Sequence, residues 1–342
     1  MNILVLRFSA IGDVAMTVPV VDSLARQYPE NIYTVVSQSF LHSLFENCPE
    51  NVHFVGVNLE NEYKGAPGMY RLYRELSKLE IDAVADLHDV LRTKLLRFFF
   101  CCSGLKVRHI NKGRKEKRSL TRKKDKIFRQ LKPTTERYTD VFSALGQTLS
   151  TLDFRSIFGA SRGKFDRIVQ FTGIKSGFWI GIAPFAKHKC KMLPLNCMKQ
   201  VVAYFAGKED VNVFLFGGGM LEKAILDEWS NEYPKTMTVT GKLTMSAELI
   251  LMSHLDVMVS MDSANMHLAS LTATPVVSVW GATHPYLGFY GYKQSPENAV
   301  QVELDCRPCS VYGNKPCHRN NPVCMNEITA QMLIDKINLK KS

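Results

Sequence analysis

Short apolar runs alternate with longer helical patterns from one end of the chain to the other. The runs are rich in β-branched and aliphatic residues, whereas the stretches between them carry apolar residues three and four positions apart. This alternation predicts βαβ units with parallel strands. The predicted strands are residues 3–6, 33–36, 52–57, 83–87, 105–109, 178–183, 211–216, 237–239, 256–259 and 276–279. The predicted helices are residues 14–27, 67–79, 89–100, 136–149, 195–207, 220–231, 245–253 and 263–271.

One polar stretch, residues 150–176, interrupts this rhythm and marks a domain boundary. A chain of 342 residues is also longer than one ordinary domain and suits two. We therefore predict an α/β protein with two Rossmann-like, doubly wound parallel-sheet domains, at residues 1–160 and 175–342. Ligands bind at the carboxyl ends of the strands in such sheets, so the two domains are expected to face a central cleft.

The composition indicates a soluble globular protein, because 46% of the residues are hydrophobic and 22% are charged. No apolar run approaches the roughly 20 residues that span a bilayer. The opening stretch resembles a signal peptide only superficially, since Arg7 and Asp13 interrupt it and no charged region precedes it. A cytoplasmic protein is therefore expected.

The positive charge is concentrated in residues 106–137, which hold 14 Lys and Arg against three Asp and Glu. Their balance of +11 equals the net charge of the whole chain. Such a block predicts a solvated, mobile segment of the N-terminal domain that meets an anionic lipid, a membrane surface or a nucleic acid; a merely soluble loop is the alternative. A nucleic-acid partner is not expected, because Phe128 and Tyr138 are too few aromatics for base stacking.

Asp13 lies where the first predicted strand gives way to the first helix. A carboxylate at the carboxyl end of a strand is well placed to act as a general base, and Arg7 and Ser9 lie close enough in sequence to orient an acidic acceptor. Gly12 allows a tight backbone at the turn. An ordinary acidic residue in the first turn of a helix is the alternative interpretation of Asp13.

A similar junction in the second domain carries Asp262 and Ser263. Both are good N-cap residues, and the backbone N–H groups that follow them suit a diphosphate. His267 lies about one turn further on, where a packed core position is the alternative. Lys187 and Lys191 follow the first strand of this domain, and Glu222 follows a glycine turn after the next strand, where an acid can bind ribose hydroxyls.

Four motifs together resemble the ADP-heptose:lipopolysaccharide heptosyltransferases, glycosyltransferase family 9. They are RFSAIGDV at 7–14, KMLP at 191–194, FGGGMLE at 216–222 and SMDSANMHLASLTATPVVSVWGATHP at 260–285. The resemblance covers most of the chain and is weakest across residues 106–176. It implies a GT-B fold, with the acceptor in the N-terminal domain and a nucleotide-sugar donor in the C-terminal domain.

The resemblance further implies an inverting displacement at the anomeric carbon, without a metal ion or any other cofactor. Asp13 matches the catalytic base of the family. The expected acceptor-binding residues are Arg7, Ser9, Gly12, His88 and Arg92, although ordinary caps and surface charge explain His88 and Arg92 equally well. The expected donor-binding residues are Lys187, Lys191, Glu222, Asp262, Ser263, Ala264 and His267.

The implied partners are ADP-heptose and a lipid-linked anionic saccharide of the lipopolysaccharide core. The basic segment would then hold the protein peripherally on the anionic inner face of the inner membrane. Ser263 and Ala264 replace the Thr-Gly pair frequent in the family, and Leu193 replaces a frequent tryptophan, so a hexose or another heptose donor stays open. The alternatives are a non-catalytic or differently specific nucleotide-sugar-binding GT-B protein, and an epimerase, which would need several acid and base groups around one substrate.

Nine cysteines are present, and four of them cluster near the C-terminus as Cys306, Cys309, Cys317 and Cys324. Two, seven and six residues separate successive members, which suits a tetrahedral structural zinc site, with His318 as a substitute ligand. A disulfide pair and reduced thiols packed in a small loop are the other interpretations.

Overall fold

The computed structural model describes residues 1–341, except for the side chains of Leu339 and Lys341. Ser342, the last residue of the predicted C-terminal domain, lies outside the described residues. The chain forms two compact units. The first consists of Met1–Lys112 and Lys132–Gly159, and the second of Gly113–Leu131 and the residues from Ala160 onward.

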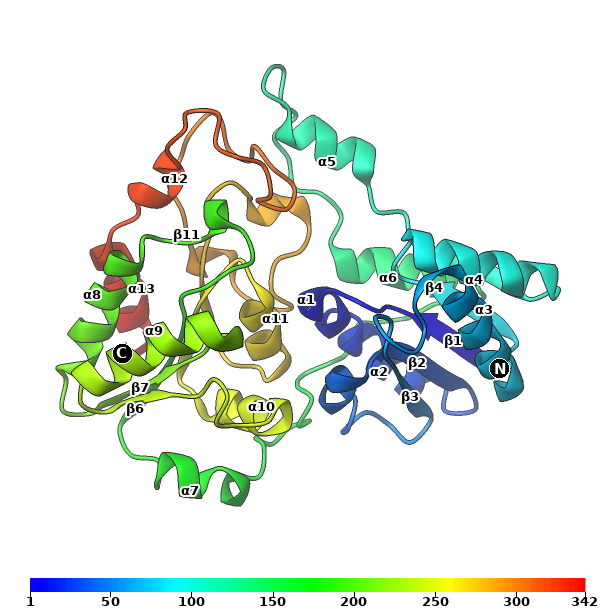
Figure 1. Ribbon diagram of the computed structural model, residues 1–342, viewed down its shortest axis with the longest axis horizontal. Helices are drawn as coiled ribbons and strands as arrows, with labels where there is room; N and C mark the ends of the chain where they lie inside the picture. The colour runs from blue at the N-terminus through cyan, green and yellow to red at the C-terminus, as the bar shows by residue number, and fades with distance from the viewer. Residues whose placement is uncertain (342) are drawn as a thin grey trace. The chain divides into compact units, whose positions relative to one another are not determined.

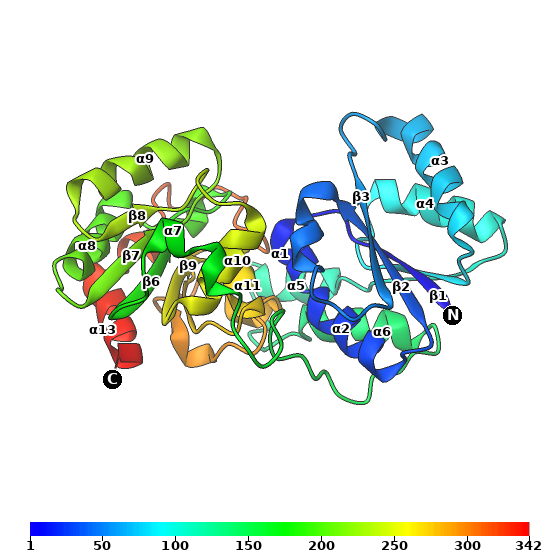
Figure 2. The same cartoon turned by 90° about the horizontal axis from the view of Figure 1, so that it is seen from below.

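The first unit contains a five-stranded parallel sheet in the order β3-β2-β1-β4-β5. Its strands are β1 (Asn2–Leu6), β2 (Ile32–Gln38), β3 (Val52–Val57), β4 (Ala83–Asp86) and β5 (Lys106–His109). The helices are α1 (Ile11–Ala15), α2 (Val18–Gln27), α3 (Gly65–Leu76), α4 (Leu91–Cys102) and α6 (Thr134–Ser143). Figures 1 and 2 show α3 and α4 side by side. The central strands β1 and β4 are almost completely buried, as strands covered on both faces must be.

The second unit contains a six-stranded parallel sheet in the order β11-β10-β9-β6-β7-β8. Its strands are β6 (Phe178–Ala183), β7 (Val211–Leu215), β8 (Thr236–Thr238), β9 (Val257–Met261), β10 (Val276–Val279) and β11 (Ala299–Val300). The helices are α5 (Arg114–Thr121), α7 (Val169–Thr172), α8 (Leu195–Ala206), α9 (Gly219–Glu232), α10 (Met245–His254), α11 (Ala264–Leu271), α12 (Val323–Asn326) and α13 (Ala330–Lys341). The predicted α/β class with two doubly wound parallel sheets is confirmed (Figure 1).

The predicted helix over residues 14–27 is divided into α1 and α2. Pro19 occupies the first turn of α2, where its missing N–H costs nothing but where it cannot continue the helix before it. Helix α1 also begins earlier than expected, at Ile11, and Asp13 therefore lies in its first turn. Asp13 therefore lies just after the loop that joins β1 to α1.

The basic segment has more regular structure than its charge predicts. Residues that the sequence suggests are mobile form β5, α5 and the start of α6, and 113–131 belong to the second unit rather than the first. Leu120 is completely buried in a small apolar cluster with Leu131 and Leu287. The backbone N–H of Leu131 donates to the carbonyl of Tyr286 at 2.9 Å. Two apolar anchors thus hold an otherwise charged segment.

These anchors give a first prediction. Leu120→Ala is expected to destabilise the second unit by about 2–3 kcal/mol, because it removes buried methyl groups and leaves a cavity. Hydrogen exchange of the α5 amides should rise with it. The matched control is Leu91→Ala, since Leu91 is 84% exposed on α4 and should cost little. Equal losses in the two variants would show that α5 is not anchored through Leu120.

Among residues 1–341, no helix is long and apolar enough to cross a membrane.

Candidate active site

Asp13 is held by a buried arginine at the carboxyl end of β1. Nη2 of Arg7 lies 2.7 Å from Oδ2 of Asp13, and Nη1 of Arg7 donates to the carbonyl of Leu87 at 2.7 Å. The Arg7 side chain is 7% exposed, whereas the Asp13 side chain is 40% exposed. Burial opposes the charge of Arg7, but Tyr138, Asp13 and Asp86 outweigh it and raise its pKa. The result is an accessible carboxylate fixed by a permanent buried cation.

Backbone contacts fix Asp13 from two further sides. The N–H of Ala10 donates to Oδ2 of Asp13 at 3.3 Å. The hydroxyl of Tyr138, which is fully buried on α6, donates to the backbone carbonyl of Asp13 at 3.2 Å. Gly12 is buried beside it and Ser9 is half-buried in the preceding loop. The loop therefore presents the Asp13 carboxylate in one orientation.

His88 follows β4 and lies near the same carboxylate. Asp86 organises this turn, because its Oδ1 accepts the N–H groups of His88 at 2.8 Å and Asp89 at 2.9 Å. Burial, with help from the charges of Arg7 and Lys112, lowers the pKa of His88 to about 3. His88 is therefore neutral at physiological pH. Arg92, one turn further on at the start of α4, is exposed.

This environment predicts a pH dependence of stability. The pKa of His88 is about 3 when folded, against roughly 6.5 when unfolded, so between these values the unfolded state binds more protons. Protonation of His88 therefore leaves the free energy of unfolding unchanged above about pH 6.5. Below that pH it lowers the free energy of unfolding, by up to about 1.4 kcal/mol per pH unit. The thermal midpoint should fall less steeply between pH 7 and pH 5 in His88→Gln than in the wild type. Equal slopes of the thermal midpoint against pH in the two proteins would contradict the lowered pKa of His88.

Asp262 is the centre of the candidate donor site. It directly follows β9 and is 2% exposed, yet its Oδ2 contacts both Nζ of Lys191 at 2.8 Å and the hydroxyl of Thr283 at 2.7 Å. Lys191 comes from the loop after β6 and Thr283 from the loop after β10. Because β6 and β10 flank β9 in the sheet, the fold brings all three side chains to the same edge. Asp262 thus holds a cation in place.

The other residues predicted for this junction follow Asp262 into α11. Ser263 is the N-cap of that helix, and its Oγ lies 3.2 Å from Oγ of Ser260. Ala264 begins the helix, and His267 is 7% exposed on it. The Ser263 side chain makes no cap hydrogen bond, so the first N–H groups of α11 are not satisfied by it. A helix start of this kind suits an anionic ligand.

Glu222 and Lys187 lie on other loops of the second unit. Oε2 of Glu222 accepts the N–H of Gly218 at 2.6 Å, so this carboxylate also closes the glycine turn before α9. Lys187 is exposed in the loop after β6, where its charge and that of Lys191 help burial to lower the pKa of His188. Of Glu222, Lys187 and Lys191, the structure brings only Lys191 into contact with Asp262.

Two important residues were not predicted from the sequence. Thr283 lies within the motif at 260–285, but its hydrogen bond to Asp262 depends on the order of the strands. Arg307 is 3% exposed and donates to the carbonyls of Gly281 at 2.6 Å, Trp280 at 3.0 Å and Thr283 at 3.1 Å. It therefore shapes the loop that carries Thr283. The sequence shows Arg307 only as one more cation between two cysteines.

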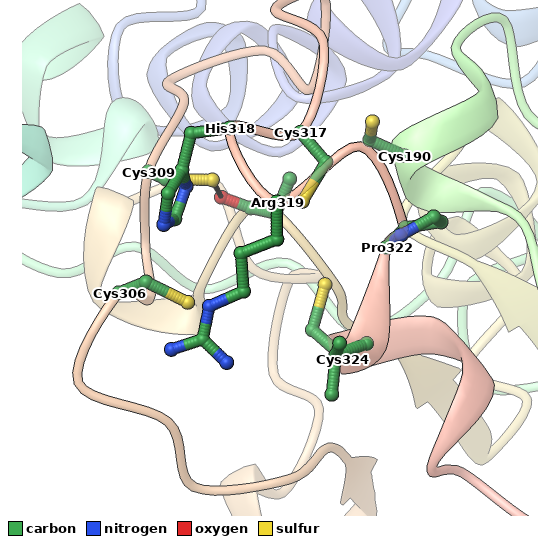
Figure 3. Close-up of a pocket in the computed structure, with 10 residues that line it drawn as sticks. Cys190, Cys306, Cys309, Cys317, His318, Arg319, Pro322 and Cys324 are labelled. Carbon is green, nitrogen blue, oxygen red and sulfur yellow. Dashed lines mark hydrogen bonds between the residues drawn. The ribbon is translucent and has the colours of Figure 1, made fainter.

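The four clustered cysteines lie together in the second unit, with Cys190 and His318, around a small pocket (Figure 3). All nine cysteines are free thiols, so no disulfide pair forms here. Within residues 1–341, no three His, Cys, Asp or Glu side chains are already arranged to hold a metal ion.

The chain is similar in sequence or in fold to known heptosyltransferases. The lipopolysaccharide core heptosyltransferase OpsX of Haemophilus influenzae is 22% identical over 289 residues, which cover 83% of this chain and 80% of that protein. ADP-heptose lipopolysaccharide heptosyltransferase II of E. coli superposes with a TM-score of 0.74 at 18% identity, covering 100% of this chain and 98% of that one. E. coli heptosyltransferase WaaC with ADP gives 0.68 at 15% identity, covering 99% and 100%.

These superpositions confirm the predicted GT-B fold. Residues 69–318, most of the chain, match the sequence model of glycosyltransferase family 9 (heptosyltransferase). The chain therefore belongs to glycosyltransferase family 9, the heptosyltransferase family, and is a glycosyltransferase.

Proposed function

We propose that this protein transfers a heptose from ADP-heptose to a sugar of a lipid-linked lipopolysaccharide core, with inversion and without a divalent metal at the reacting bond. The observation that carries the proposal is the accessible Asp13 carboxylate, 2.7 Å from a buried Arg7. Family membership supports heptose rather than hexose as the sugar. The name of the Haemophilus relative supports a lipopolysaccharide acceptor, and ADP in the WaaC structure supports the nucleotide.

The reaction is a single displacement. An acceptor hydroxyl oxygen attacks the anomeric carbon while the bond from that carbon to the diphosphate oxygen breaks, and ADP leaves. Asp13 takes the hydroxyl proton as the new bond forms. Arg7 keeps this carboxylate oriented, and because Arg7 itself is only 6% exposed we assign it to positioning Asp13 rather than to binding the acceptor.

The donor residues supply the charge that a metal ion would otherwise supply. Lys191 neutralises the diphosphate as negative charge develops on it, and the N–H groups at the start of α11, around Ser263 and Ala264, add hydrogen bonds. Asp262 positions Lys191 through their 2.8 Å ion pair. Glu222 binds the ribose hydroxyls, while Lys187 and His267 complete the site around the phosphates and the sugar.

The acceptor meets the first unit near Asp13. Ser9 and Gly12 follow β1, neutral His88 and exposed Arg92 follow β4, and all four bind the acceptor sugar and its acidic groups. Exposed cations of α5 and of the loop after it contact acceptor phosphates or the anionic membrane surface, which places the protein peripherally on the inner face of the inner membrane. Such contacts weaken as salt rises, since they are screened.

The stereochemistry of the product tests this mechanism. Proton NMR of the transferred sugar, with EDTA in the reaction, should show the anomeric configuration opposite to that of the donor. Retention of configuration would exclude direct displacement. Loss of transfer in EDTA, restored by Mg²⁺, would exclude the proposed role of Lys191 as the replacement for a metal. Binding of the donor with no transfer to any acceptor would favour a non-catalytic protein.

A further inference from the structure

One side of α4 is apolar although it is exposed to solvent. Leu96 and Phe100 are completely buried in the core of the first unit, so the opposite side of the helix is expected to be polar. Leu91 and Phe98 lie seven positions apart on that opposite side and are 84% and 61% exposed. Leu95 lies between them and is half-buried. These three residues form an exposed apolar stripe along α4.

The stripe continues onto α3, which lies beside α4 (Figures 1 and 2). The ring centroid of Phe98 is 5.9 Å from that of Phe99, and the ring centroid of Phe99 is 5.4 Å from that of Tyr70 on α3. Tyr70 is itself 48% exposed. Single exposed apolar residues are ordinary, but a contiguous group marks a surface that binds a partner. We call this group the α3/α4 face; it consists of Leu91, Leu95, Phe98, Phe99 and Tyr70.

Basic residues border the α3/α4 face, because α4 holds three cations and no acidic residue. One of them, Lys94, lies next to the stripe in the helical repeat, and its side chain is 50% exposed. Helix α3 adds the exposed Arg71 and Arg74. Its one acidic residue, Glu75, accepts a hydrogen bond from the hydroxyl of Tyr63 at 2.5 Å. The exposed charge beside the face is therefore mainly positive.

The apolar and cationic groups together indicate the partner. An apolar centre with a cationic border matches the boundary between anionic headgroups and acyl chains, where aliphatic and aromatic side chains are buried and lysines reach phosphates. A second copy of this chain would instead place the same cations against one another. We propose that the α3/α4 face is a docking surface for an anionic phospholipid bilayer. The inference rests on the proposed function for its membrane-bound acceptor, and it adds an apolar contact that salt does not screen.

Docking through this face brings the acceptor side of the first unit to the membrane surface. Helix α4 begins shortly after the turn that carries His88. Arg97 joins the helix to this turn, because its Nε lies 3.3 Å from Oδ2 of Asp86 and its Nη2 donates to Oδ1 of Asp89 at 3.2 Å. When α4 lies on a bilayer, it therefore holds the His88 turn where a lipid-linked acceptor is found.

A fluorescent reporter tests insertion directly. The three tryptophans, Trp179, Trp229 and Trp280, are buried in the second unit, so a new tryptophan on α4 is read against a constant background. Vesicles of phosphatidylethanolamine and phosphatidylglycerol should shift the emission of Phe98→Trp to shorter wavelength, and brominated acyl chains should quench it. Ile174→Trp is the control, because Ile174 is 84% exposed in the second unit, and its emission should not change.

Flotation with the same vesicles separates apolar binding from electrostatic binding. At about 1 M salt the screening length falls to about 3 Å, so the contacts of exposed basic residues are lost. The wild type should still float with the vesicles, whereas Leu91→Ser/Phe98→Ser should lower the partition coefficient at least about tenfold. Ile174→Ser/Phe40→Ser should match the wild type, because these side chains are 84% and 52% exposed outside the α3/α4 face. Circular dichroism checks that each variant is folded.

Four results would overturn the proposal. Three come from the vesicles: an unchanged emission of Phe98→Trp, complete release of the wild type by salt, and equal binding of the two double variants. The fourth comes from analytical ultracentrifugation, where a wild-type dimer that Leu91→Ser/Phe98→Ser abolishes would assign the face to a second copy of the chain. The vesicles contain neither ADP-heptose nor an acceptor saccharide, so failure of docking and failure of the proposed transfer are observed separately.

Discussion

Asp13→Asn is expected to lower kcat by about 10²–10⁴-fold while leaving the affinity for ADP-heptose nearly unchanged. Asparagine keeps the size of the side chain but cannot accept the proton of the acceptor hydroxyl. The loss should therefore fall on the chemical step and leave donor binding intact. Initial rates at saturating acceptor, together with calorimetric titration of the donor, separate these two effects.

Asp140→Asn provides the control for charge. Asp140 lies on α6 of the same unit, where its exposed carboxylate pairs with Lys132 at 2.6 Å. Exposed pairs contribute little, so its activity should match the wild type. A rate in Asp13→Asn within a few-fold of the wild type would show that another group accepts the proton. Equal losses in both variants would show that the effect is electrostatic and not specific to the base.

Lys191→Ala should lower kcat/KM for the donor by about 10²–10³-fold, the second largest effect. The substitution removes the cation proposed to neutralise the leaving diphosphate. It also leaves the carboxylate of Asp262, which is 2% exposed, without its ion-pair partner. Lys189→Ala is the matched control, because Lys189 is exposed on the same short turn and carries the same charge.

A double-mutant cycle shows how Asp262 acts. If Asp262 works by positioning Lys191, Asp262→Asn combined with Lys191→Ala should be no worse than Lys191→Ala alone. Strictly additive losses would mean that Asp262 contacts the donor independently. A Lys189→Ala variant as impaired as Lys191→Ala would contradict the special role of Lys191 and indicate a general charge effect of the loop.

The fold could be predicted because its strands have a strong sequence signal. Buried parallel strands such as β6 and β9 are short, largely apolar runs, and their length and flanking turns distinguish them from helices. Asp13 and Asp262 were recognisable for a related reason, since each directly follows such a run. Position at the carboxyl end of a strand is readable from a sequence even when contacts are not.

The contacts within the site could not be predicted in the same way. Lys191 contacts Asp262 because β6 lies next to β9 in the sheet. The order of the strands cannot be predicted from the local pattern of apolar residues. Arg307 carries no sequence signal for burial, yet it is 3% exposed and its guanidinium donates to backbone carbonyl groups. The basic segment is the opposite case. Its charge predicts a mobile segment, but Leu120 within it is buried and fixes α5 on the second unit.

Heptose transfer itself tests the central claim most directly. Purified protein is incubated with ADP-heptose and a heptose-free Kdo–lipid A acceptor, and the lipid product is analysed by mass spectrometry. The account predicts that the acceptor gains one heptose residue and that ADP appears in equal amount. An unchanged acceptor, together with tight binding and turnover of a different nucleotide sugar, would contradict the proposed donor and acceptor while leaving the family assignment intact.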